Sequence, residues 1–192
     1  MIRTFIALEL DDSIRDILGG VIRQMAQELP PIRWVDPQGI HLTLAFLGDL
    51  TDEQVAKARQ AAEATAQQVE PFRFRLSHLG VFDSSQYPRV IWVGVTEPSG
   101  ALLQLHSLLN RELERRGFGV ERRVFSPHLT LARIKIPLNH EERQRLLHLL
   151  GETKVVSSPQ HAGRLCVMRS ELLRSGASYT SLGDYVLGEG RK

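Results

Sequence analysis

One short sequence containing histidine and threonine occurs twice in this chain. The pentapeptide HLTLA begins at His41 and again at His128. Residues two apart on a β-strand point the same way, so His41 and Thr43 share one face, as do His128 and Thr130. The intervening leucines point to the opposite face, where they can pack in a core. If the two strands face each other, two imidazoles and two hydroxyls meet in one cleft.

This set of side chains suits acid–base chemistry at phosphorus. An imidazole titrates near neutral pH, so one histidine can act as a base while the other acts as an acid. Threonine hydroxyls can donate hydrogen bonds to the non-bridging oxygens of a phosphate. A strained cyclic phosphodiester, or attack by a ribose 2′-oxygen, makes such displacement easiest without a metal. The motif pair therefore predicts a phosphoesterase site with His41 and His128 as catalytic residues and Thr43 and Thr130 as phosphate-binding residues.

A metal site is the competing use of two histidines. Neither HLTLA segment has carboxylates or thiolates at ligand spacing, and the chain contains no HExxH sequence and only one cysteine, Cys166. We therefore expect neither a metal nor a cofactor. We interpret the other five histidines as structural.

Arg133 closes the second motif and would suit a phosphate group. Strict alternation along the strand places it with Leu129 and Leu131, away from His128. A β-bulge, or a strand that ends at Ala132, would be needed to turn it toward the cleft. We include Arg133 as a candidate phosphate-binding residue.

The repeat extends beyond the two motifs and predicts the fold. The motifs are 87 residues apart, and the same offset carries the alternating strand at 2–10 onto the strand at 89–97. We predict two pseudo-symmetric β-α-β-α-β units, about 1–85 and 88–187, whose antiparallel sheets face a central cleft. Because each unit alone is too small for a comfortable core, we expect one bilobal α+β domain over residues 1–192.

Apolar periodicity predicts the elements of each unit. Capping-box patterns begin at Thr51 and Asn139, and an Asp-Asp-Ser cap begins at Asp11. The expected helices cover about 14–29, 51–68, 99–116 and 139–151. The expected strands lie at 2–10, 41–48, 72–77, 89–95, 127–135, 164–168 and 179–187, and a short segment at 33–35 leads to the second of them.

Composition limits the class of protein. The net charge is +2, with 20 Arg against 4 Lys, so the charge of the whole chain indicates little about its partners. No apolar stretch approaches the roughly 20 residues of a membrane helix, and no signal peptide is evident. The single cysteine is typical of a reducing compartment. We expect a cytoplasmic monomer that does not bind membranes.

The segments RWVDPQGIHLTLAFLGDL and SPHLTLAR resemble the two HxTx motifs of the 2H phosphoesterase superfamily. The most similar branch is that of the bacterial and archaeal RNA 2′,3′-cyclic phosphodiesterases, also called 2′-5′ RNA ligases (LigT- or ThpR-like). RTFIALEL and QYPRVIWVGV fit the same branch, so the resemblance covers nearly the whole chain.

This resemblance implies a bilobal α+β fold with the motifs facing across a groove. It implies metal-independent hydrolysis of RNA ends that carry a 2′,3′-cyclic phosphate, tRNA fragments among them, to 2′-phosphates. By its motifs, His41 matches the proton donor and His128 the proton acceptor, while Thr43 and Thr130 match the phosphate-binding hydroxyls.

Three other functions stay open at this point. RNA ligation through a 2′-5′ linkage is the alternative within the enzyme class. A module that binds RNA ends without turnover is the alternative outside it, because two small lobes rich in arginine also suit single strands. A small cyclic nucleotide or an ADP-ribose cyclic phosphate is a further candidate substrate.

Three aromatic residues near the motifs could stack on bases, as aromatic side chains often do in RNA sites. They are Phe5, Trp34 and Phe46. We interpret each as better suited to core packing. Phe46 is the least suited to base contact, because strict alternation places it with Leu42 and Leu44.

Overall fold

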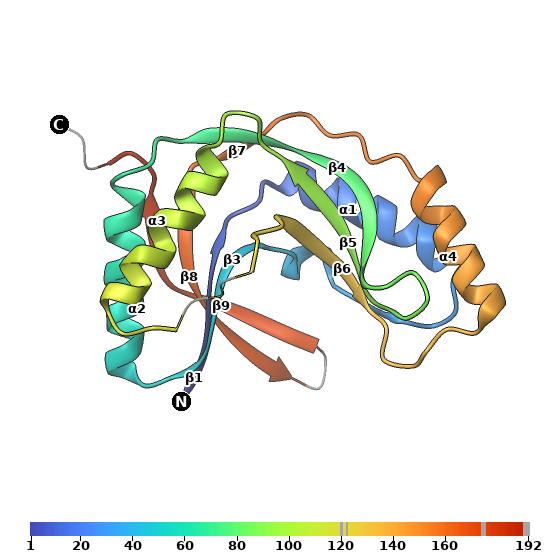
Figure 1. Cartoon of the computed structure of the whole chain (residues 1–192), viewed down its shortest axis with the longest axis horizontal. Helices are drawn as coiled ribbons and strands as arrows, with labels where there is room; N and C mark the ends of the chain where they lie inside the picture. The colour runs from blue at the N-terminus through green and yellow to red at the C-terminus, as the bar shows by residue number, and fades with distance from the viewer. Residues whose placement is uncertain (120, 122, 174–175, 190–192) are drawn as a thin grey trace.

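Two antiparallel β-sheets flanked by helices form the molecule (Figure 1). The computed structural model describes residues 1–119, 121, 123–173 and 176–189. The elements in chain order are β1 (Ile2–Leu8), α1 (Asp12–Ala26), β2 (Arg33–Trp34), the short 3-10 turn η1 (Pro37–Gly39), β3 (Leu42–Leu50), α2 (Asp52–Ala66), β4 (Phe72–Asp83), β5 (Pro88–Thr96), α3 (Ala101–Arg115), β6 (His128–Arg133), α4 (His140–Glu152), β7 (Gln160–Ala162), β8 (Arg164–Leu173) and β9 (Gly176–Val186).

The two sheets exchange two strands each between the repeat units: β2 and β4 of the first unit lie in the second sheet, and β8 and β9 of the second unit lie in the first. One sheet has the order β3-β1-β8-β9 and the other has the order β2-β6-β5-β4-β7. Strand β4 comes from the first unit but pairs with β5 of the second, whereas β8 comes from the second unit but pairs with β1 of the first. The α+β fold with two antiparallel sheets is confirmed, but the sequence units do not coincide with the two lobes.

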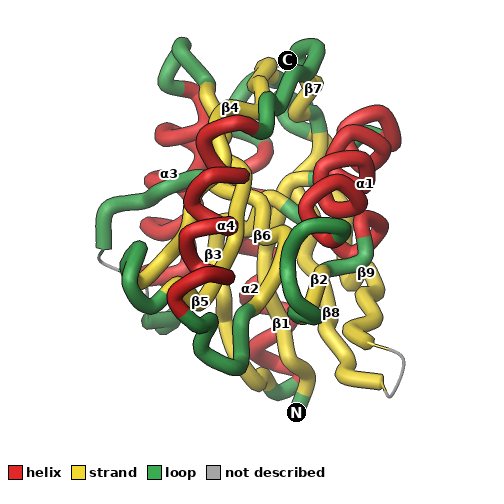
Figure 2. Tube along the Cα trace, turned by 90° about the vertical axis from the view of Figure 1, so that its right-hand side faces the viewer, coloured by secondary structure: helices red, strands yellow, loops and turns green. Residues whose placement is uncertain are grey.

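The helices follow the same exchange. Figure 1 shows α2 and α3 along one side of the molecule and α1 and α4 along the other. Figure 2 shows α1 and α4 next to each other in front of the strands of the second sheet. An ion pair of 3.0 Å between Arg145 of α4 and Glu28, just beyond α1, joins these two helices. Each lobe therefore carries one helix from each sequence unit.

Of the three helix caps predicted from the sequence, two are confirmed and one is wrong. Thr51 and Asn139 begin full capping boxes at α2 and α4, as predicted. Asp11 occupies the cap position of α1 but makes no side-chain capping bond. Its backbone N–H instead donates to the side chain of Gln160, 3.0 Å away. The predicted side-chain cap of this helix is therefore wrong.

The leucines of both motifs pack in the core, as their alternation predicts. Leu42, Leu129 and Leu131 are fully buried, and Leu44 is nearly so. These side chains fix the orientation of both strands, because reversing either strand would expose its leucines to water. In the part of the chain that the structure describes, no helix has the length and apolar character needed to cross a membrane.

Candidate active site

A cleft of about 1270 Å³ lies where β3 of one sheet approaches β6 of the other. Its lining includes His41 just before β3, Thr43 on β3, and Thr130 and Arg133 on β6. Strand β1 and the β8–β9 hairpin contribute much of the remaining wall. The two motif strands thus meet across one groove, although they are 87 residues apart in the chain.

Both motif histidines are held by the same backbone contact. Nδ1 of His41 lies 2.9 Å from the carbonyl oxygen of Gly39, and Nδ1 of His128 lies 2.8 Å from that of Ser126. A carbonyl oxygen can only accept a hydrogen bond, so Nδ1 carries the hydrogen in both rings. In each neutral ring the lone pair is therefore on Nε2, which is the atom free to exchange a proton.

His41 lies in an aromatic pocket at the wall of the cleft. Its ring meets Tyr179 edge-on at a centroid distance of 4.8 Å and Phe5 at 5.5 Å. Burial, helped by the positive charge of Arg15, lowers the pKa of His41 to about 4, while the hydrogen bond to Gly39 acts in the opposite direction. The His41 ring is therefore neutral at pH 7 in the free protein.

His128 has a similar setting in the other lobe. Its ring meets Phe82 edge-on at 4.6 Å and Trp92 at 6.5 Å. Burial lowers its pKa, the bond to Ser126 raises it, and the charge of Arg133 lowers it. His128 is not among the described residues that line the cleft. Thr130, two residues later on β6, does line it.

A β-bulge turns Arg133 toward the cleft. The pairing of β5 with β6 passes over Leu131, and the pairing of β1 with β3 passes over Leu44, the equivalent residue at the offset of 87. One extra residue reverses the alternation beyond it. Arg133 therefore lines the cleft with Thr130 instead of facing the core with Leu129.

The equivalent bulge in β3 overturns the prediction for Phe46. Strict alternation predicted that Phe46 would face the core, but its side chain is 72% exposed and lines the cleft. Phe5 is 4% exposed and packs as predicted, with an edge at the cleft wall. Trp34 is half-buried and also lines the cleft.

Apart from Phe5, sequence reasoning missed the aromatic residues that enclose the two histidines: Tyr179, Phe82 and Trp92. Applying the repeat offset to Phe5 gives Trp92, and each contacts the histidine of its own lobe. The repeat therefore contained a signal for Trp92. No comparable signal marked Tyr179, which the hairpin brings over the turn before His41. An added Cβ on Gly39 would lie 3.0 Å from the Tyr179 ring, so this close approach depends on the glycine.

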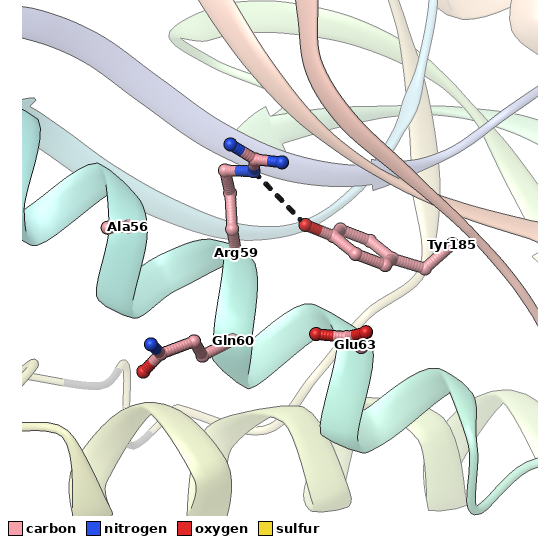
Figure 3. A pocket seen from close by; sticks show the side chains of 5 residues that line it. All are labelled: Ala56, Arg59, Gln60, Glu63 and Tyr185. Atoms are coloured by element: carbon pink, nitrogen blue, oxygen red, sulfur yellow. Dashed lines mark hydrogen bonds between the residues drawn. The ribbon is translucent and has the colours of Figure 1, made fainter. Parts of the chain in front are cut away.

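A second, smaller hollow of about 220 Å³ lies on α2, next to β9 (Figure 3). There the Nε–H of Arg59 donates to the Tyr185 hydroxyl at 3.2 Å. None of its lining residues belongs to the motifs. Across the described residues, no group of three or more histidine, cysteine, aspartate or glutamate side chains could hold a metal ion.

Comparison with known proteins identifies relatives over the whole repeat. The profile of the family described as LigT like Phosphoesterase matches residues 8–92 and again residues 93–179. A protein of Methanothermobacter thermautotrophicus named RNA 2′,3′-cyclic phosphodiesterase is 31% identical over 182 residues, which cover 94% of this chain and 96% of that protein.

Solved structures show the same architecture. A protein of Thermus thermophilus matches over 97% of this chain and 98% of its own, with a TM-score of 0.80 and 26% identity. Escherichia coli LigT in complex with 3′-AMP matches over 97% of this chain and 98% of its own, with a TM-score of 0.68 and 26% identity. These matches, the doubled profile and the twin HLTLA strands agree: the chain belongs to the LigT-like phosphoesterase family.

Proposed function

We propose that this protein hydrolyses RNA ends carrying a 2′,3′-cyclic phosphate to 2′-phosphomonoesters. One observation carries the proposal: His41, Thr43 and Thr130 line one groove, His128 lies two residues before Thr130 on β6, and each imidazole has Nδ1 bound to a backbone carbonyl. The names of the relatives, RNA 2′,3′-cyclic phosphodiesterases, support this choice of substrate.

The two histidines divide the proton transfers. His128 takes a proton from water as the water oxygen attacks phosphorus. His41 gives a proton to the ribose 3′-oxygen as the bond from phosphorus to that oxygen breaks. The product keeps its phosphate on the 2′-oxygen, and water restores the protonation states of both rings. The resemblance to the family sets this direction, because the near-symmetry of the cleft permits either assignment.

Three side chains hold the phosphate during this step. The hydroxyls of Thr43 and Thr130 donate to its non-bridging oxygens, where negative charge grows in the transition state. Arg133 supports the same oxygens with a permanent positive charge. Two imidazoles supply both the acid and the base, so we propose that the reaction needs no metal. The whole chain acts as one bilobal domain and as a monomer, with RNA as its partner.

A substrate with sulfur in place of the bridging 3′-oxygen tests these roles. A thiolate leaves without protonation, so loss of the acid should matter little on this substrate. We expect His41→Ala to recover most of its activity there and His128→Ala to stay slow. The opposite pattern would exchange the roles. Rescue of neither variant would contradict proton transfer by these histidines.

The product and the metal requirement complete the test. We expect a nucleoside 2′,3′-cyclic phosphate to give only the 2′-phosphate, with full activity in excess EDTA. A 3′-phosphate product would contradict the proposed leaving group. Activity that EDTA abolishes and Mn²⁺ or Zn²⁺ restores would contradict the two-histidine mechanism.

A further inference from the structure

Two arginines lie directly opposite each other in the wall of the cleft. In the pairing of β2 with β6, Arg33 is the partner of Arg133. Side chains of directly opposed residues project from the same face, with Cβ atoms about 4.5–5.5 Å apart. Both residues line the cleft and both are exposed. Two cations are therefore held side by side at the edge of the second sheet.

This pair lacks a compensating anion among the described residues. Neither guanidinium makes an ion pair or a hydrogen bond to any residue whose placement is described. The nearby carboxylate of Asp36 also lines the cleft, but it accepts the backbone N–H of Gln38. Opposed like charges destabilise a strand pair. A bound anion would remove this repulsion.

The position of Arg33 separates it from the reacting phosphate. Arg133 lies three residues beyond Thr130 along β6, or about 7–10 Å of strand. Arg33 lies beside Arg133 on the outer strand β2. Arg133 can reach back to the group that Thr130 holds, whereas Arg33 is better placed for a second group farther along the groove.

From this geometry we infer that Arg33, next to Arg133, forms a subsite for a second phosphate group, the one on the 5′ side of the terminal nucleoside. The inference rests on the proposed function, because it assumes that the cyclic phosphate lies between the motifs. Its consequence concerns the class of substrate. The protein prefers the end of an RNA chain to a free nucleoside 2′,3′-cyclic phosphate, because only the chain carries the second phosphate.

The opposite wall of the cleft supports this orientation. At the repeat position that corresponds to Arg133, the first unit has Phe46, exposed in the cleft. Leu172, 71% exposed, lies in the same lining. One wall thus carries the paired cations, whereas the other, which also includes Arg3 of β1, exposes two large apolar side chains. A nucleotide can place its phosphates against the first wall and its base against these apolar side chains.

Three substrates test the subsite: adenosine 2′,3′-cyclic phosphate, its 5′-phosphorylated form, and the dinucleotide ApA ending in the cyclic phosphate. We expect kcat/KM for the last two to exceed that for the first by about 10-fold or more, the usual effect of a charge-assisted hydrogen bond. Arg33→Gln should remove most of this advantage. Arg111→Gln, which removes an exposed arginine on α3 outside the cleft lining, should leave the ratio at its native value.

Two further measurements keep the test independent of folding. Arg33→Lys keeps the charge without the paired donors and should retain part of the advantage. For the native protein, the slope of log kcat/KM against log salt should be steeper for ApA than for adenosine cyclic phosphate by about 0.7, the value for one extra phosphate contact on a single strand. Equal slopes would contradict the subsite.

The other possible results of these measurements separate failure of the subsite from failure of the proposed function. Native ratios near one, or a ratio that Arg33→Gln changes no more than Arg111→Gln, would overturn the inference. An advantage for ApA alone that does not depend on Arg33 would assign it to the second base and would also overturn it. If no substrate turns over, the proposed function fails instead. The subsite is then tested by the affinity of Arg33→Gln for ApA 2′-phosphate against adenosine 2′-phosphate.

Discussion

At the scale of single residues, His41 and His128 have surroundings that disfavour their positive charge. The pKa of His41 is about 4, and that of His128 is also below its ordinary value. The proposed mechanism requires His41 protonated and His128 neutral. It therefore predicts that kcat/KM falls when the pH rises above the higher of the two apparent pKa values and when it falls below the lower one. Because both values are lowered in the free protein, the maximum of kcat/KM should lie on the acid side of the ordinary histidine pKa.

The same reasoning predicts a difference between two pH profiles. A bound phosphate anion near the rings raises both pKa values, so the profile of kcat should lie at higher pH than that of kcat/KM. The apparent pKa values on the two sides of each profile belong to the coupled pair of histidines and not to either ring alone. Steady-state rates across the acidic and neutral range would measure both profiles. A kcat/KM maximum above neutral pH would contradict the environment described for His41.

The threonine hydroxyls can be tested by removing only the donor. Thr43→Val and Thr130→Val keep the shape of the side chain but lose a hydrogen bond to the phosphate. We expect each variant to reduce kcat by about 10²-fold or somewhat less while the protein remains folded. Both residues are half-buried, so circular dichroism and thermal unfolding serve as controls. Loss of activity only through unfolding would show that the hydroxyls are structural.

At the scale of elements, α1 holds the turn that precedes the first motif. The Arg15 guanidinium donates to the carbonyl oxygens of Pro37, Gln38 and Ile40 at 3.3, 2.6 and 3.3 Å. These bonds fix the 3-10 turn η1, whose last residue, Gly39, binds Nδ1 of His41. The helix therefore positions the His41 imidazole, and the positive charge of Arg15 helps to keep this ring neutral.

Two substitutions separate these effects of Arg15. Arg15→Gln removes the charge, so the pKa of His41 should rise from about 4 in an NMR titration of the histidine ring signals. Arg15→Lys keeps the charge, but the shorter side chain places its ammonium differently from the guanidinium that contacts the three carbonyls. The pKa should therefore stay low while kcat falls by about 10-fold through misplacement of the ring. Arg23→Gln, an exposed position later in the same helix, is the matched control. An unchanged pKa in Arg15→Gln would contradict the electrostatic role.

At the scale of the whole molecule, the exchanged strands β4 and β8 predict one cooperative unfolding transition. Each sheet contains two strands from the other sequence unit, so neither unit can bury its apolar surface alone. Tryptophan fluorescence reports on the second sheet through Trp34 and Trp92, whereas far-ultraviolet circular dichroism reports on both lobes. The two denaturation curves should coincide. Separate midpoints would mean that the lobes unfold independently.

Much of this protein could be predicted from its sequence. The HLTLA repeat, its offset of 87 and the alternation around it predict two related units and the facing histidines and threonines, because these signals depend on residues close together in the chain. The caps at Thr51 and Asn139 are equally local and are confirmed. The catalytic and phosphate-binding roles of the motif residues stay predictions.

Other features were decided only by the tertiary structure. The bulges at Leu44 and Leu131 depend on the register of the neighbouring strand, so alternation alone misplaced Phe46 and left Arg133 undecided. Tyr179 reaches His41 from a hairpin near the other end of the chain. The pairing of Arg33 with Arg133 joins residues 100 positions apart. Sequence patterns describe which way a side chain points on its own strand, but partners and register arise only when distant strands pack to bury their apolar faces.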